Sequence, residues 1–448
     1  MSATTTPPAN ATPVAPPLKG GLAPPGPKLP PWFAKALFLL RSEQVITGLR
    51  RRYGDVFATH LPVFGRCVVV ARPDLVKQVF QASPDVLVFG KVSPLGDLIG
   101  AGSLFAMDGE QHLHERRLIL PAFHGERMRT YEVIIEEEAR RELATWPEGT
   151  PFATMPAFMR ITLNAILRAV FGASGEDVDE LAAILPDFVT LGSRLALLPW
   201  LQRDLGPRSP GGRLKRLRRR YDDIIERMID AGLADPQLAE RDDVLSMLLR
   251  ANYEDGSSMS RAAIADELLT LLAAGHETTA TSLAWAVERL RRNPWILHRL
   301  TAEARAGGGT LRLATIHEVQ RTRPVITATG RHALEDFQLG EYVVPEGWHI
   351  IIAARLIHND SRFFERPMQF QPDRFLEAKP DTYTWLPFGG GTRRCIGAAF
   401  AHMEMDVVLR TLLQEFDLTT TEAPGEAWAD RGVAVAPGDG GLAVVTRV

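Results

Sequence analysis

The sequence predicts a mainly α-helical fold with a minor β region, and three patterns carry this prediction. Apolar residues at helical spacing dominate residues 111–300. Within them, residues 260–293 form one continuous pattern, which predicts a helix of about 50 Å that crosses the core. Short β-branched runs with glycine turns, at residues 56–70 and 331–354, predict the β region.

The N-terminal segment is the first element and differs from the rest in composition. Residues 1–31 contain ten prolines together with Ala, Thr and Gly. Such a segment buries too little apolar surface to order itself, so we expect a disordered Pro/Ala-rich tail over 1–31. No internal repeat divides the remainder, and we expect one domain over residues 32–448.

Two elements have clear boundaries in the sequence. A turn at Gly65 separates two predicted strands, and Pro73 opens the helix that follows them. The long helix has a good N-cap in Ser260 and stops at Asn293 and Pro294, because the residue before a proline avoids the helical region.

Composition restricts the class of protein. The chain is 45% hydrophobic and 23% charged with a net charge of -3, which is ordinary for a globular protein and gives no hint of nucleic-acid binding. Its two cysteines, Cys67 and Cys395, exclude a disulfide scaffold and fit a reducing compartment. The apolar stretch 32–40 is far shorter than the ~20 residues of a membrane span. We therefore expect a cytoplasmic protein without a membrane span.

The stretch FGGGTRRCIG, residues 388–397, places Cys395 in a glycine-rich loop just before a predicted helix. Helix N-termini favour a thiolate. A buried apolar cysteine, a catalytic nucleophile and a thiolate ligand of haem iron all remain open at this point. Structural zinc is excluded, because it needs about four ligands and the chain has two cysteines.

The stretch AAGHETTATS, residues 273–282, interrupts the long helix with polar groups. Gly275 and the carboxyl of Glu277 are costly in a buried helix, although leucines flank them on both sides. A helix that lines a cavity is the favoured interpretation, and a solvent-facing stretch is the alternative. Threonine hydroxyls that bond backwards also suit a local kink or π-bulge, and an acid beside the Thr278 hydroxyl can relay protons.

Three further sets of charged residues stand out. Glu318 and Arg321 lie one helical turn apart, and His112 and Arg116 share a helix face that suits an anion clamp or a plain surface pair. The run RLKRLRRR, residues 213–220, forms a basic helix face. For this run, solvation is favoured over contact with a membrane or nucleic acid.

In this order, the motifs closely resemble those of the cytochromes P450, the haem-thiolate monooxygenases. The cysteine loop matches the family pattern Phe-x-x-Gly-x-Arg-x-Cys-x-Gly at Phe388, Gly391, Arg393, Cys395 and Gly397. The other matches are the oxygen-binding pattern of the long helix (Ala274, Gly275, Glu277, Thr278 and Thr279), the Glu-x-x-Arg pair with its locking arginine (Glu318, Arg321 and Arg374), and the positions that grip the haem propionates (His112, Arg116, Arg331 and Arg393).

The resemblance implies a fold, a cofactor and a reaction. The long helix would cross the distal side of haem b, with Cys395 as the iron ligand and Phe388 shielding its sulfur. Thr278 would hold dioxygen and Glu277 would supply protons, so that one oxygen atom enters the substrate. Electrons would come from NAD(P)H through a separate ferredoxin and ferredoxin reductase, and the protein would act as a monomer. The partner would dock near Arg127 and Arg129, with plain solvated surface as the equal alternative for these two arginines.

The expected substrate is a hydrophobic small molecule such as a terpenoid, fatty acid or steroid. The segments that would form its pocket are rich in apolar residues, among them Leu191, Leu195, Val325, Ile326 and Val435. Two alternatives remain: a haem-thiolate sensor without turnover, and a peroxide-using peroxygenase or an isomerase on the same fold.

Overall fold

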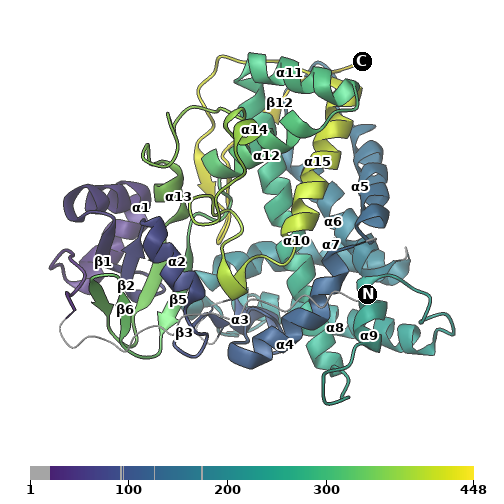
Figure 1. Cartoon of the computed structure of the whole chain (residues 1–448). Coiled ribbons are helices and arrows are strands. Elements are labelled where there is room, and N and C mark those ends of the chain that lie inside the picture. Colours follow the sequence, from purple (N-terminus) through teal and green to yellow (C-terminus); the bar gives the residue numbers. More distant parts are fainter. Residues whose placement is uncertain (1–20, 91–92, 94, 126, 173–174) are drawn as a thin grey trace, which may run out of the picture.

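The computed structural model describes residues 21–448 except residues 91–92, 94, 126 and 173–174. The predicted mainly helical architecture with a minor β part is confirmed. Strands β1, β2, β5 and β6 gather on one side of the molecule, whereas α5, α6, α10 and α15 stand together on the other (Figure 1). In the described part of the chain, no helix is long and apolar enough to cross a membrane.

The helices are α1 Pro31–Tyr53, α2 Pro73–Gln81, α3 Gly96–Ile99, α4 Gly109–Ile119, α5 Arg127–Leu143, α6 Met155–Phe171, α7 Glu176–Ala196, α8 Pro210–Ala234, α9 Val244–Arg250, α10 Arg261–Arg291, α11 Pro294–Arg305, α12 Thr310–Thr322, α13 Ala354–His358, α14 Arg374–Glu377 and α15 Ala398–Glu415. Short 3₁₀ turns are η2 Leu120–Phe123, η3 Pro199–Leu201 and η4 Gly391–Arg393.

The strands are β1 Val56–Leu61, β2 Gly65–Val70, β3 Leu87–Val88, β4 Phe152–Ala153, β5 Thr329–Ala333, β6 Phe337–Leu339, β7 Tyr342–Val344, β8 His349–Ile352, β9 Phe416–Leu418, β10 Trp428–Asp430, β11 Val435–Pro437, β12 Leu442–Ala443 and β13 Val445–Arg447. The largest described sheet has five strands in the order β1-β2-β8-β5-β3. Strands β2 and β8 pair in parallel, and the other neighbours in this sheet are antiparallel.

The β1–β2 hairpin forms where the sequence predicts it. Its register runs from Val56 opposite Val70 to Leu61 opposite Gly65. Gly65 has a φ of 69°, a left-handed conformation that glycine adopts without steric cost. Cys67 is fully buried on β2, where it packs as a core residue.

The predicted tail lies outside the described residues as far as residue 20. Residues 21–30, however, run along the β region, where Leu22 exchanges backbone hydrogen bonds with Glu341 and Val343, and the Pro25 carbonyl accepts from Ala58. Backbone pairing therefore begins about ten residues before the predicted boundary at residue 31.

Helix α10 is the long, largely buried helix that crosses the core of the molecule. The Ser260 hydroxyl caps it by accepting from the Ala263 amide at 3.1 Å, and the helix continues to Arg291, as the sequence predicts. The helix is α-helical throughout, so no π-bulge occurs in this described segment. Thr278 and Thr279 do bond backwards to the carbonyls of Ala274 and Gly275, and these bonds leave the helical ladder intact.

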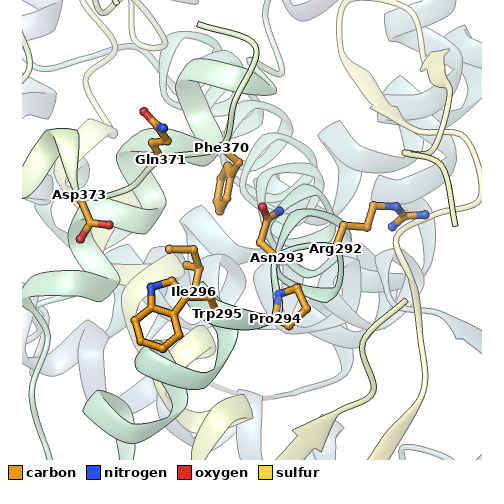
Figure 2. Close-up of a pocket in the computed structure, with 8 residues that line it drawn as sticks. All are labelled: Arg292, Asn293, Pro294, Trp295, Ile296, Phe370, Gln371 and Asp373. Carbon is orange, nitrogen blue, oxygen red and sulfur yellow. The ribbon is translucent and has the colours of Figure 1, made fainter. Parts of the chain in front are cut away.

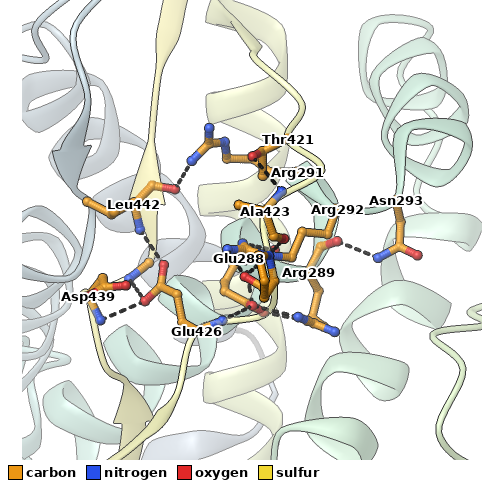
Figure 3. Close-up of polar contacts among 12 residues, drawn as sticks. Glu288, Arg289, Arg291, Arg292, Asn293, Thr421, Ala423, Glu426, Asp439 and Leu442 are labelled. Carbon is orange, nitrogen blue, oxygen red and sulfur yellow. Dashed lines mark hydrogen bonds and ion pairs between the residues drawn. The ribbon is translucent and has the colours of Figure 1, made fainter.

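The C-terminal segment is tied to the end of α10 through two buried carboxylates (Figure 3). Glu288 pairs with Arg289 and Arg292 and accepts the backbone N–H of Glu426 at 3.0 Å. The Glu426 carboxylate in turn accepts three backbone N–H groups, from Asp439, Gly441 and Leu442. This network holds the β10–β11 hairpin beside α10, and the Trp285 indole donates to the Val435 carbonyl at 3.0 Å.

Candidate active site

The cysteine loop is a tight turn between Phe388 and the start of α15. The Cys395 amide donates to the Phe388 carbonyl at 2.9 Å, and Gly397 is the N-cap residue of α15. The Phe388 ring is half-buried and meets the His402 ring edge-on, with centroids 4.9 Å apart. The loop therefore sits at a helix N-terminus, as the sequence predicts.

The glycines of this loop are needed for a close approach to helix α2. Gly391 has a φ of 66°, and a Cβ there would collide with the Phe80 carbonyl; a Cβ on Gly390 would collide with the Phe80 ring. The contact that the structure shows is with α2, which anchors the loop.

Cys395 is surrounded by protein and yet accessible. Desolvation raises the pKa of its thiol, whereas the Gly397 N–H and the charges of Arg116 and Arg394 act in the opposite direction. Nevertheless the residue is exposed to molecules of solvent size. A bound metal cation would supply the positive charge that deprotonates the thiol there.

One face of α10 is also accessible in the middle of an otherwise buried helix. Ala274 is exposed and Thr278 is partly exposed, and these residues lie four apart on one face. Leu271, Leu272 and Leu283, on either side along the helix, are buried. The Thr278 hydroxyl donates to the Ala274 carbonyl at 2.7 Å, which leaves its oxygen able to accept a further hydrogen bond.

Glu277 has a partner that the sequence did not reveal. Its carboxylate is buried and accepts from Arg431 Nε at 3.0 Å. The turn around Arg431 is clamped to α7, because the Ser193 hydroxyl donates to the Arg431 carbonyl at 3.0 Å. No motif marks Arg431, which lies 154 positions from Glu277, so only the folded structure could identify it.

A second missed residue is Glu404 on α15. It is fully buried, and desolvation raises the pKa of its carboxyl well above the usual range, with the Thr279 hydroxyl lowering it in part. Neither Glu404 carboxyl oxygen makes a hydrogen bond with a described residue, so this buried acid on α15 lies near Thr279 of α10 without a firm partner. A signal was present in the sequence, because Glu404 falls on an apolar stripe, four residues after Phe400 and four before Val408.

The predicted propionate-binding residues converge around His112. Burial and the neighbouring charges of Arg393, Arg116 and Arg331 lower the pKa of His112 to about 3, so its ring is neutral at pH 7. Burial lowers the pKa of Arg331 to about 10, and the nearby Arg393 acts in the same direction. The chain thus concentrates three guanidinium groups around one neutral imidazole.

The negative charge in this cluster is small. Arg393 pairs with Asp108 and donates to the Leu104 carbonyl at 2.8 Å. Arg331 and Arg116 make no ion pair with any described residue, although Arg331 is buried and Arg116 is half-buried. Buried cations need a counter-charge, and the two carboxylates of a haem would supply it. The residues present therefore fit haem.

The Glu-x-x-Arg pair lies in the interior beside α14. Glu318 and Arg321 are fully buried and joined by two hydrogen bonds of 2.7 and 2.8 Å. Arg374 Nε approaches the Glu318 carboxylate at 3.3 Å. Arg321 also donates to the carbonyls of His358 and Pro367, so the three predicted residues tie α12 to the chain that leads into the cysteine loop.

A separate surface hollow lies between the start of α11 and residues 370–373 (Figure 2). Its volume is about 370 Å³, and none of the predicted site residues lines it. Trp295 stands at its edge with 70% of its surface exposed. This hollow is thus distinct from the cysteine loop and the accessible face of α10.

Comparison with known proteins agrees with this geometry. The family profile of cytochrome P450 matches residues 24–438. A Mycobacterium tuberculosis protein named as a cytochrome P450 138 is 53% identical over 424 residues, which cover 94% of this chain and 95% of that protein. One named as a cytochrome P450 135B1, from the same species, is 40% identical over 90% of this chain and 87% of its own length. These names state a family and no substrate.

Solved structures show the same fold. A cyanobacterial CYP120A1 with bound retinoic acid superposes with a TM-score of 0.83 at 23% identity and covers 96% of this chain and 100% of its own. The haem domain of cytochrome P450DA gives a TM-score of 0.81 at 21% identity, covering 96% and 98%. With the cysteine loop, the accessible helix face and the cationic cluster in place, the chain belongs to the cytochrome P450 family, a family of haem monooxygenases.

Proposed function

We propose that this P450 inserts one oxygen atom of O₂ into a hydrophobic small molecule, with electrons from NAD(P)H delivered by a separate ferredoxin and its reductase. The observation that carries the haem site is the cationic cluster of Arg116, Arg331 and Arg393 beside an accessible Cys395. Haem b would be held by Cys395 Sγ and by these guanidinium groups together with the neutral His112 ring. When bound, the haem supplies the oxygen-activating redox chemistry.

Groups in and near the cysteine loop act to lower the pKa of the Cys395 thiol, which is the proposed ligand. The Gly397 N–H donates to Cys395 Sγ, and the charges of Arg116 and Arg394 lie close enough to lower the thiol pKa. A thiolate that accepts such bonds is stabilised against protonation. In this proposal Phe388, whose ring packs edge-on against His402, would shield the sulfur from water.

In this proposal, residues of α10 supply the protons that the reaction consumes. Thr278 already donates to the Ala274 carbonyl, so its oxygen would accept a hydrogen bond from a water on the accessible face. Glu277 is adjacent in sequence but is held by Arg431 at 3.0 Å. In this proposal, Arg431 is a positioning residue, because it fixes the direction in which the carboxylate can exchange protons.

The proposal of a hydrophobic substrate is supported by apolar residues that stay accessible in the segments expected to form the pocket. Ala273, Leu191, Ile326 and Val435 are partly buried and apolar, and Ala328 is exposed. Few charged groups lie among them, which favours an apolar molecule. The retinoic acid in the cyanobacterial structure is a ligand of that protein and is used here only as a member of the test panel.

The redox partner would dock on the cysteine side. Arg394 and Arg129 are exposed, whereas Arg127 is partly buried and pairs with Asp242 at 3.6 Å. Exposed guanidinium groups near the thiolate suit an acidic ferredoxin, whose association would weaken as salt rises.

The first test is a titration of the ferric protein with fatty acids, terpenoids and steroids, followed through the Soret band. A low-to-high-spin shift with one class identifies the substrate class, and no shift with any member contradicts a free hydrophobic substrate.

Cys395→Ser should abolish the long-wavelength band of the reduced CO complex, and an unaltered band would remove Cys395 as the ligand. Thr278→Ala should keep that band but release peroxide for each NAD(P)H consumed; full coupling would remove Thr278 from the proton path.

A further inference from the structure

Two histidines lie side by side on the five-stranded sheet, apart from the residues of the candidate active site. His332 on β5 and His349 on β8 stand directly opposite each other in the antiparallel register. Their ring centroids are 4.6 Å apart, and the ring planes are inclined by 56°. Two imidazoles that bind one zinc ion at about 2.0–2.1 Å have centroids roughly 4.5–5 Å apart. The spacing of this pair therefore suits two ligands of one ion.

Each ring also carries a buried nitrogen that is not satisfied. The Nδ1 atoms of His332 and His349 are both buried and have no hydrogen-bond partner among the described residues. Buried polar atoms in proteins are nearly always paired, so two such atoms on neighbouring rings require an explanation. A neutral imidazole nitrogen with a free lone pair is the commonest metal-binding atom in proteins.

Both imidazoles are in the neutral form that binds metal. Burial lowers the pKa of His349 to about 4, with His332 acting in the same direction and the Phe64 backbone acting in the opposite one as a hydrogen-bond acceptor. Burial lowers the pKa of His332 as well. Because Nδ1 of His349 has no partner, its contact with the Phe64 backbone is made by Nε2. A ligating histidine typically donates its other N–H to such a carbonyl, which fixes the tautomer.

The pair lies on the face of the sheet that is turned away from the cationic cluster. Successive residues of a strand point to opposite faces, so His332 and Arg331 lie on different sides of the sheet. The neighbour of His349 across the parallel β2–β8 pair is Cys67, which belongs to an apolar cluster that packs against Leu49 of α1. The sheet thus separates the two histidines from the proposed haem site.

The other groups near the pair restrict what the ion can use as ligands. The Cys67 thiol donates to the Gly65 carbonyl at 3.5 Å, and burial raises its pKa to about 12, so it is a poor ligand. Within the described ranges of the chain, no three metal-binding side chains are grouped closely enough to share an ion. His332 and His349 are both partly exposed, which leaves room for water as the remaining ligands.

We propose that His332 and His349 form a site for a divalent transition metal ion, with zinc as the first choice, bound through the Nδ1 atom of each ring and completed by water. Imidazole suits zinc, copper and nickel, whereas magnesium and calcium prefer oxygen ligands. The ion would tie β5 to β8 across the sheet. Because the unfolded chain has no such paired site, binding would stabilise the folded protein.

The first test is equilibrium dialysis of the full-length holoprotein against Zn²⁺, with zinc counted per chain. We expect the wild type to bind one zinc ion and His332→Gln and His349→Gln to bind it at least about tenfold more weakly, since the loss of even an outer partner of a ligand costs that much. His114→Gln is the control, because His114 is exposed and lies 3.8 Å from Glu110, and it should bind like the wild type. No zinc on the wild type, or equal binding by His332→Gln, overturns the proposal.

The second test identifies the ligand atoms in the wild type and does not depend on how the variants fold. X-ray absorption at the zinc edge, which is separate from that of haem iron, should show two imidazoles with nitrogen at about 2.0–2.1 Å and otherwise oxygen. A zinc shell without imidazole would mean an adventitious ion only, and sulfur at about 2.3 Å would assign the ion to a cysteine; either result overturns the proposal. Zinc should leave the Soret band of the CO complex unchanged, since the sheet lies between the two sites.

Discussion

We expect Glu267 on α10 to make the stability of this protein depend on pH near neutrality. It is fully buried, and one carboxyl oxygen accepts the Leu104 N–H at 2.9 Å. The other oxygen has no hydrogen-bond partner among the described residues. Burial raises the pKa of Glu267 to about 8, with the nearby carboxyls of Glu115 and Asp266 acting in the same direction.

The sign of the effect follows from this raised pKa. The folded protein keeps the Glu267 proton up to about pH 8, whereas the unfolded chain releases it near the ordinary value of 4.5. Between these values the unfolded state binds fewer protons, so stability falls as pH rises. At 1.36 kcal/mol per unit of pKa, raising the pH from about 6 to about 8 should cost ~2 kcal/mol of unfolding free energy from this group.

Glu267→Gln tests this directly, because a neutral amide oxygen can still accept from Leu104 but cannot titrate. The free energy of unfolding in urea, measured from pH 6 to 8, should fall less for the variant than for the wild type, by about 2 kcal/mol over that range. Glu254→Gln is the control, since Glu254 is exposed. Parallel pH curves for the wild type and Glu267→Gln would refute the reasoning.

Three other substitutions test the supports of the site through the urea midpoint. Arg321→Met leaves the fully buried Glu318 without its main partner and should cost about 3–5 kcal/mol; a loss below 1 kcal/mol would contradict a buried ion pair. Ser260→Ala removes the N-cap of α10 and should cost about 1 kcal/mol, whereas an unchanged midpoint would mean that the cap is dispensable. Gly391→Ala should cost more than about 1 kcal/mol, because φ is 66° and the new Cβ would meet the Phe80 carbonyl; tolerance would show that the loop can move.

Local patterns in the sequence were enough to predict the helices and strands. They were also enough to predict pairs of residues that interact within one helix. Ser260 and Pro294 predict the limits of α10 because capping and the steric effect of proline are local. Glu318 and Arg321 pair because residues three apart share a helix face. The glycine-rich loop before α15 was likewise visible, although the sequence could not show that Phe80 is the group that requires its glycines.

Contacts between distant segments were decided only by the tertiary structure. Arg431 binds Glu277, and Arg393 binds Asp108. The two residues of each pair are far apart in the sequence, and no motif links them. The charge of the cluster around His112 likewise depends on three separate elements brought together by packing. The sequence by itself determined the helices, the cysteine loop and the family, because these depend on local spacing. Only the fold determined which buried charges are paired, because burial and pairing are properties of three-dimensional neighbours.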